Sequence, residues 1–231
     1  MGIEILIIFV IGAFVYATLG IHLLNKHRTK KLNKVALKYG YEFYETDPGY
    51  SNTISSANYK LLNIGHSGKI CNIFAKQIEL IAGQNFLPGI KMIFDYSYYS
   101  TSGTKPIIYT QTVLSFKSKV LTLPSFSLHK GCFLESLLSK FDGIKDINFK
   151  NYPGFSNKYS LWGENEEEIR EFFDNSLLVF FENFPEAINV DTGNDSVIIF
   201  FEKRRLEEND IMILSDILDR IVTIFKIRME N

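Results

Sequence analysis

An uncharged apolar run close to the N-terminus constrains this chain more than any other feature. Residues 5–24, ILIIFVIGAFVYATLGIHLL, contain no lysine, arginine or acidic residue. As a helix with about 1.5 Å rise per residue, the run is roughly 30 Å long, which matches the hydrocarbon core of a bilayer. Because a helix also satisfies its own backbone hydrogen bonds in lipid, we predict a transmembrane helix at residues 1–24.

A signal peptide, a lipidation site and a core helix each agree less well with the residues around the run. A secretory signal peptide needs positive charge before its apolar part, where this chain has Glu4. N-myristoylation of Gly2 expects Ser or Thr at the sixth position, which is Leu6. A helix in a soluble core normally has a polar face, and residues 5–21 lack one.

A basic segment, residues 25–40, follows the apolar run and is predicted to form a juxtamembrane helix. It contains no acidic residue and six cations: Lys26, Arg28, Lys30, Lys31, Lys34 and Lys38. Because lysine and arginine stay on the cytoplasmic side, we predict a single-pass protein of the cytoplasmic (inner) membrane, with its N-terminus outside and its soluble domain in the cytoplasm. The cations are also candidates for contact with anionic lipid headgroups, although the topology alone accounts for them.

Residues 41–231 are predicted to form one soluble domain, which is long enough to bury a core. Of 25 basic and 26 acidic residues in the chain, six basic residues and Glu4 precede Tyr41, so the domain has six more acidic than basic residues. That excess argues against a general nucleic-acid-binding protein. Cys71 and Cys132 have neither metal-ligand nor disulfide spacing, and two unpaired thiols suit a reducing cytoplasm.

The patterns in this domain predict an α+β fold in which helices cover one face of a mainly antiparallel sheet. Strands are expected at residues 72–83, 90–100, 107–118, 125–130 and 157–164, with a hairpin that turns at residues 192–194. Helices are expected at residues 29–39, 132–141, 164–184 and 208–228. Gly40 is predicted to end the first of these, and Asp174-Asn175 offers a cap that would divide the third.

No catalytic, cofactor-binding or metal-binding motif is complete, and we predict no residue for any of these sites. GHSGK at residues 65–69 lacks the first glycine and the final Ser or Thr of a phosphate-binding loop, so a glycine turn is favoured. DTGNDS at residues 191–196 is favoured as a hairpin turn over a calcium loop. His66 and His129 have no partner at ligand spacing, although a Ser/His/Asp group could still assemble in space. Acidic residues are expected at the start of a helix, as at Glu164, Glu166, Glu167 and Glu168.

Four tyrosines near one predicted turn are candidates for a partner-binding surface: Tyr96, Tyr98, Tyr99 and Tyr109. Amphipathic rings are enriched at recognition surfaces. The alternative is that they cover sheet edges in a chain rich in aromatic residues, since single exposed apolar rings are common.

Several stretches of the chain resemble a family of uncharacterised bacterial proteins. They follow the anchor and the basic helix, and they read FDYSY (94–98), YTQTV (109–113), LPSFSL (123–128) and INFKNYPGFSNKYSLWGENEEEIREFF (147–173). The resemblance implies one N-terminal spanning helix, a soluble α+β domain and a location at a bacterial inner membrane. The family has no assigned activity, so the resemblance implies no catalytic residue.

The predicted function is therefore a membrane-tethered cytoplasmic domain that binds another protein, as an adaptor or accessory subunit. A membrane-anchored enzyme, for example a hydrolase with dispersed active-site residues, is the alternative, and it predicts a deep cleft lined by polar groups. A third hypothesis, sensing of the lipid surface, rests on the six cations of residues 25–40.

Overall fold

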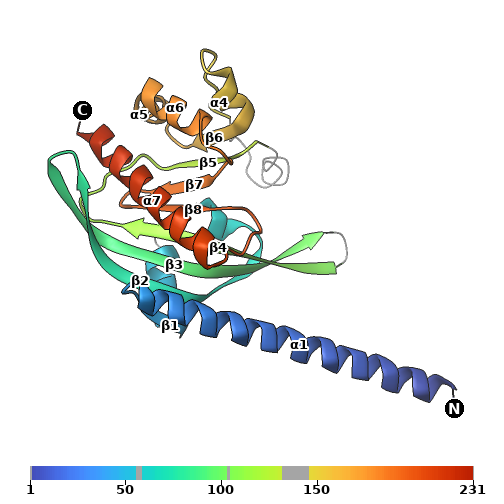
Figure 1. The fold of residues 1–231 in the computed structure, drawn as a ribbon. Helices are drawn as coiled ribbons and strands as arrows, with labels where there is room; N and C mark the ends of the chain where they lie inside the picture. Colours follow the sequence, from blue (N-terminus) through green and yellow to red (C-terminus); the bar gives the residue numbers. More distant parts are fainter. Residues whose placement is uncertain (1, 56–58, 103–104, 132–145, 231) are drawn as a thin grey trace.

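The computed structural model describes residues 2–55, 59–102, 105–131 and 146–230, which build an α+β fold around one sheet (Figure 1). Eight strands are hydrogen-bonded in the order β1-β2-β3-β4-β8-β7-β5-β6. All seven neighbouring pairs are antiparallel. The predicted class, α+β with an antiparallel sheet, is therefore confirmed.

The sheet begins as a meander and then doubles back through the second half of the chain. Its strands are β1 (Glu42–Thr46), β2 (His66–Ala82), β3 (Asn85–Ser102), β4 (Lys105–Lys117), β5 (Phe126–Lys130), β6 (Tyr159–Gly163), β7 (Asn189–Gly193) and β8 (Ser196–Phe200). β4 pairs with β8 rather than with β5, and β5 lies between β7 and β6. β7 and β8 form a hairpin, and longer connections place this hairpin between β4 and β5.

Two predicted strand boundaries are shifted for local reasons. The strand predicted at 157–164 begins at Tyr159, because a short helix, α4 (Pro153–Lys158), occupies the preceding residues. The hairpin turns at Asn194-Asp195 and not at 192–194, because Gly193 still pairs with Ser196. Thr192 also stays in the strand, where its hydroxyl accepts a hydrogen bond from the Phe126 N–H.

A single continuous helix, α1 (Gly2–Lys38), contains both the predicted apolar segment and the basic segment. Within the described residues, no helix is both long enough and apolar enough to cross a bilayer, and the span predicted at residues 1–24 stays a prediction. α1 ends as expected at Gly40, which has a positive φ of 72°. The Tyr41 N–H then donates to the Ala36 carbonyl at 2.9 Å, a hydrogen bond typical of this glycine-ended helix terminus.

The remaining helices are α2 (Tyr50–Ser55), the 3-10 turn η1 (Lys60–Asn63), α5 (Glu166–Phe172), α6 (Asn175–Glu182) and α7 (Glu208–Met229). Asp174 caps α6 by accepting from the Leu177 N–H, so the predicted division of residues 164–184 into two helices is confirmed. The predicted helix at 208–228 is confirmed as α7. The helix predicted at 132–141 lies outside the described residues.

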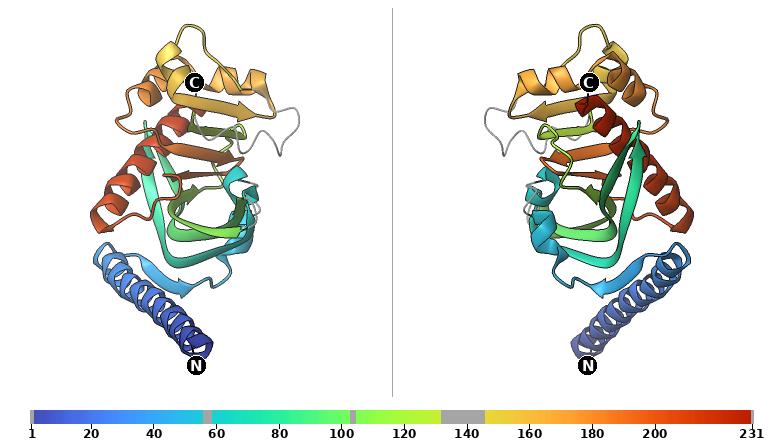
Figure 2. Two further views of the ribbon diagram at one scale, coloured as in Figure 1. Left: turned by 90° about the vertical axis from the view of Figure 1, so that its right-hand side faces the viewer. Right: turned by 90° about the vertical axis from the view of Figure 1, so that its left-hand side faces the viewer.

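Both faces of the sheet are covered, which differs from the predicted one-sided arrangement. Figure 2 shows α7 and α2 on opposite sides of the strands. The larger core joins one face to α7, α5, α6 and the end of α1, where Leu32 and Val35 are buried. A smaller core on the other face packs α2 and η1 on β2, β3 and β8. Two covered faces explain why Met92, Ile93 and Phe94 are successive apolar residues in β3, since neighbouring side chains enter different cores.

Candidate functional site

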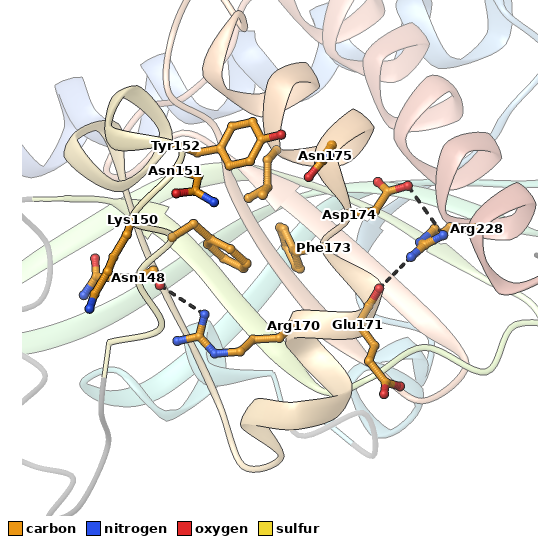
Figure 3. A pocket seen from close by; sticks show the side chains of 12 residues that line it. Asn148, Lys150, Asn151, Tyr152, Arg170, Glu171, Phe173, Asp174, Asn175 and Arg228 are labelled. Carbon is orange, nitrogen blue, oxygen red and sulfur yellow. Dashed lines mark hydrogen bonds and ion pairs between the residues drawn. The ribbon is translucent and has the colours of Figure 1, made fainter.

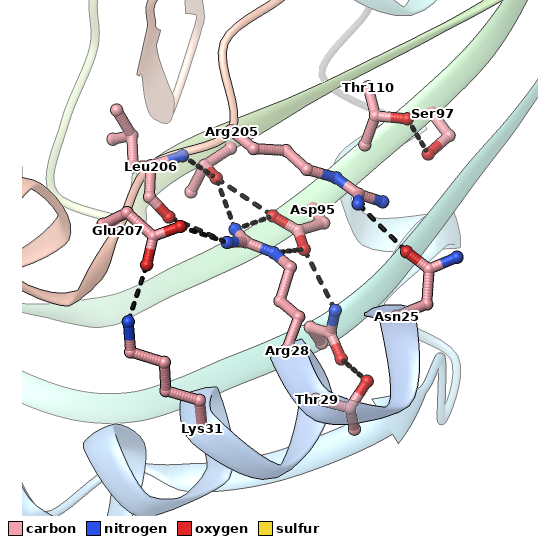
Figure 4. Close-up of polar contacts among 12 residues, drawn as sticks. Asn25, Arg28, Thr29, Lys31, Asp95, Ser97, Thr110, Arg205, Leu206 and Glu207 are labelled. Atoms are coloured by element: carbon pink, nitrogen blue, oxygen red, sulfur yellow. Dashed lines mark hydrogen bonds and ion pairs between the residues drawn. The ribbon is translucent and has the colours of Figure 1, made fainter. Parts of the chain in front are cut away.

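The C-terminal half of α1 is joined to the sheet by a buried ion pair between Arg28 and Asp95 (Figure 4). The Arg28 Nε donates to one carboxylate oxygen at 2.8 Å, and an Nη donates to the other at 2.9 Å. A third Arg28 nitrogen donates to the carbonyl of Leu206, which precedes α7. One guanidinium therefore links α1, β3 and the segment that leads into α7.

Asp95 is only 1% exposed, and its other hydrogen bonds come from neighbouring strands. It accepts from the Asn72 amide at 3.0 Å and from the Thr112 hydroxyl at 2.9 Å. Burial raises the pKa of Asp95, but Arg28 and Asn72 outweigh burial and hold that pKa below its ordinary value. The carboxylate is therefore ionised and fully bonded in the folded protein.

The structure divides the six predicted membrane-surface cations into two groups. Arg28 is bound to Asp95, while Lys31 pairs with Glu207 at 2.7 Å and Lys38 approaches Glu208 at 3.6 Å. The other three are exposed on α1: Lys26, Lys30 and Lys34. Contact of the basic segment with lipid stays a prediction, and Arg28 has a structural role that its place in a basic run did not reveal.

The four candidate tyrosines do not share one surface. Tyr96 and Tyr98 are buried in the smaller core, where their rings stack with centroids 5.7 Å apart. Tyr109 packs beside Tyr98 and is half-buried. Tyr99 is 44% exposed because it points to the opposite face of β3. The prediction of a partner surface therefore depends on Tyr99 and its exposed neighbours rather than on the buried rings.

A buried histidine–carboxylate pair joins two residues that the sequence separates by 62 positions. His129 Nε2 lies 2.6 Å from an Asp191 carboxylate oxygen, and the other oxygen accepts from the Leu61 N–H at 2.9 Å. Asp191 belongs to β7 rather than to a calcium-binding loop. Both side chains are 1% exposed or less, and the pair fastens β5, β7 and η1 together.

A polar cleft of about 700 Å³ lies between residues 148–152, α5, the start of α6 and the end of α7 (Figure 3). Its two arginines are engaged by the protein itself. Arg170 binds Glu166 at 2.8 Å and the Asn148 carbonyl at 3.1 Å. Arg228 donates to the Glu171 carbonyl at 2.7 Å, at the C-terminal end of α5. The arrangement fixes α5 against α7, which is a structural task.

An apolar groove of about 490 Å³ runs along the first half of α7. Its floor contains Phe184, Phe201 and Ile217, and Ile213 at its side is 60% exposed. Charged residues form the rim, where Arg204 pairs with Glu186 at 3.0 Å and with Asp210 at 3.7 Å. An apolar floor with a charged rim is suited to an apolar side chain of a partner protein.

Other sequence candidates have structural roles. The acidic run Glu164–Glu168 stands at the start of α5, where Asn165 caps the helix and Glu166 pairs with Arg170. Gly65 has a positive φ of 75° in the turn before β2, which agrees with the expected glycine turn. In the described part of the chain, no three His, Cys, Asp or Glu side chains are grouped as a metal site would require.

No protein-family model and no curated protein matches the chain. A solved structure does resemble it: the mycobacterial trehalose monomycolate transport factor A, TtfA. The TM-score is 0.55 at 11% sequence identity, and the match covers 87% of this chain and 92% of that one. At this identity the likeness shows a shared fold, and it transfers no residue role.

Proposed function

We propose that this chain is a membrane-tethered adaptor, in which an N-terminal anchor holds an α+β domain at the cytoplasmic face of a membrane and the domain binds another protein. The observation that carries the proposal is the exposure of apolar side chains on α1. Tyr16, Leu19, Ile21, Leu23 and Leu24 are between 57% and 82% exposed. Successive helical residues are about 100° apart, so these five side chains spread over somewhat more than half of the helix circumference, and by sequence the other apolar residues of 5–24 occupy the rest.

A bilayer suits such a helix better than a protein groove does. A groove covers one side of a helix, whereas lipid surrounds it, and a helix that is apolar all round belongs in a core or a membrane. The apolar residues extend over 5–24 in the sequence, and the exposed Lys26, Lys30 and Lys34 follow on the side expected to be cytoplasmic.

The tether is rigid where it meets the domain. Leu32, Val35 and Ala36 of α1 belong to the larger core, and Arg28 is bound to buried Asp95. The domain therefore follows the orientation of the anchor and does not hang from a flexible linker. Holding a binding domain at fixed height above a membrane raises its effective concentration toward a partner in the same membrane.

The apolar groove beside α7 is the surface that we assign to the partner. Exposed Ile213 supplies an apolar contact, and Arg204, Glu186 and Asp210 supply a polar rim, which is the arrangement of a protein-binding site. The name of the similar structure, a transport factor, supports an accessory role for the fold, without indicating a cargo for this chain.

Three experiments test the proposal. Membranes washed with alkaline carbonate are expected to retain the protein, and a membrane-impermeant thiol reagent is expected to label Cys71 only after lysis and denaturation. Release by carbonate would contradict the anchor.

For the groove, a photo-crosslinking residue at position 213 is expected to trap one protein in stoichiometric yield. The same residue at exposed Val179, on α6, is the matched control. Equal yields at both positions would remove the support for the groove.

A further inference from the structure

The β3–β4 hairpin leaves the domain on the same side as the N-terminal half of α1 (Figure 1). Both project toward the viewer in the left panel of Figure 2. The hairpin therefore points in the direction in which the proposed anchor enters the bilayer.

The Arg28–Asp95 pair brings α1 and β3 together at one point, and distances along both elements toward the membrane can be counted from there. Tyr99 lies four residues beyond Asp95, or roughly 13 Å along a strand. α1 covers the same distance in about nine residues, which leads from Arg28 to the region of Leu19. Tyr99 is thus level with the last turns of the apolar run, where a spanning helix would leave the hydrocarbon.

Three large apolar or amphipathic side chains are exposed at this level, beside the exposed His66 that pairs in register with Tyr99. Tyr99 pairs in register with Ile108, and Ser100 pairs with Ile107. Ile108 is 59% exposed and Ile107 is also exposed, although both are large apolar residues. Tyr99 and Asp95 are an even number of residues apart, so Tyr99 and Ile108 share the face of the sheet on which α1 lies.

Cations accompany these residues. Lys69 of β2 is exposed opposite Ser97, two residues before Tyr99. Arg205 is exposed and donates to the Asn25 side chain at 3.0 Å, where α1 leaves the domain (Figure 4). Positive charge beside Tyr99 and Ile108 complements an anionic lipid surface, and tyrosine is enriched at the membrane interface.

We propose that Tyr99, Ile107 and Ile108 enter the headgroup layer of the bilayer that holds α1. The inference rests on the membrane anchor of the proposed function and adds a second point of contact. A single helix leaves the domain free to rotate about the membrane normal and to tilt. A second contact, held at a fixed place by the rigid joint at Arg28, sets the tilt and so the direction in which the groove beside α7 opens.

The test uses the full chain in vesicles of phosphatidylethanolamine and phosphatidylglycerol that carry bromine near the headgroup end of the acyl chains. Bromine quenches tryptophan fluorescence on contact. Three variants each add one reporter: Ile108→Trp at the hairpin, Ile21→Trp in the anchor and Val179→Trp on α6. The native Trp162 is buried and gives a constant background. Quenching of Ile108→Trp is expected to exceed that of Val179→Trp several-fold.

The outcomes separate the two proposals. If Ile21→Trp is quenched and Ile108→Trp is quenched no more than Val179→Trp, the hairpin contact is overturned and the anchor stands. If neither Ile21→Trp nor Ile108→Trp is quenched, both fail. If the tryptophan of Ile108→Trp is shielded from water in native membranes but is exposed to water in vesicles of pure lipid, a protein covers the hairpin. The lipid contact is then overturned. Tyr99→Trp repeats the measurement should Ile108→Trp fail to fold, as judged by circular dichroism.

Discussion

Arg28 donates to both carboxylate oxygens of Asp95, at 2.8 and 2.9 Å, although 67 positions separate the two residues. The carboxylate has almost no contact with solvent, so each residue depends on the other for charge compensation. The pair fixes the angle at which α1 leaves the sheet, and both membrane proposals depend on that angle.

Replacing Arg28 by alanine is expected to lower the free energy of unfolding by about 3–5 kcal/mol, because it leaves a buried charge without a partner. Urea titration of the full chain in a mild detergent measures the change. Lys34→Ala is the control, since Lys34 is exposed on the same helix and should change stability by no more than about 0.5 kcal/mol. Similar effects of the two substitutions would show that the pair does not hold α1 in solution.

The same pair predicts how stability depends on pH. The pKa of Asp95 is lower in the folded protein than in the unfolded chain, where it is about 3.9. Its contribution is therefore complete above about pH 4 and is lost as the pH falls through the lower, folded value. Asp47 and Asp174 also have lowered pKa values, so they too make the free energy of unfolding fall in acid. Urea titrations of the native chain and of Asp95→Asn, from neutral pH downward, isolate the contribution of Asp95. The difference between their free energies of unfolding should narrow only in acid.

Local patterns in the sequence predicted much of the fold. Asp174 was recognisable as a cap because its hydrogen bond is to a residue three positions away, and Gly40 because a helix end needs a positive φ. The alternation of apolar and polar residues in β3 was also recognisable, because it is a pattern between near neighbours in the sequence. α2, η1 and β1 were not predicted, since they are short and depend on the smaller core and on the edge of β2 for their stability.

Contacts between residues far apart along the chain could not be predicted from the sequence. Arg28 looked like one of six similar cations, and only Asp95 on a distant strand distinguishes it. Asp191 has the sequence surroundings of a turn residue, and only the pairing of β5 with β7 brings His129 beside it. The buried positions of Tyr96 and Tyr98 depend on η1 covering a second face of the sheet, which no local pattern reports. The groove beside α7 likewise joins residues 184–186 to residues 201–220 through tertiary packing.

Gly65 is predicted to be far less tolerant of a side chain than Gly83, although both have a positive φ, 75° and 63°. A Cβ at Gly65 would clash with the Tyr99 carbonyl and lie 2.6 Å from the Tyr98 ring, whereas nothing lies within 4 Å at Gly83. Gly83→Ala should cost about 1–2 kcal/mol for the backbone conformation alone. Gly65→Ala should cost a further 1–3 kcal/mol, approximately, for overpacking. Equal midpoints in urea would contradict the close approach of the β2 turn to β3.

The cap of α6 provides the last prediction, with a matched pair of substitutions at Asp174. Its carboxylate accepts from the Leu177 N–H at 3.0 Å and also lies 3.4 Å from Arg228. Asp174→Ala removes the cap and the ion pair, while Asp174→Asn removes the charge but keeps an oxygen that can cap the helix. Alanine should therefore be less stable than asparagine by about 1 kcal/mol in urea titrations. If the two variants have equal stability and both are weakened, the contact with Arg228 holds α6 in place and the cap does not.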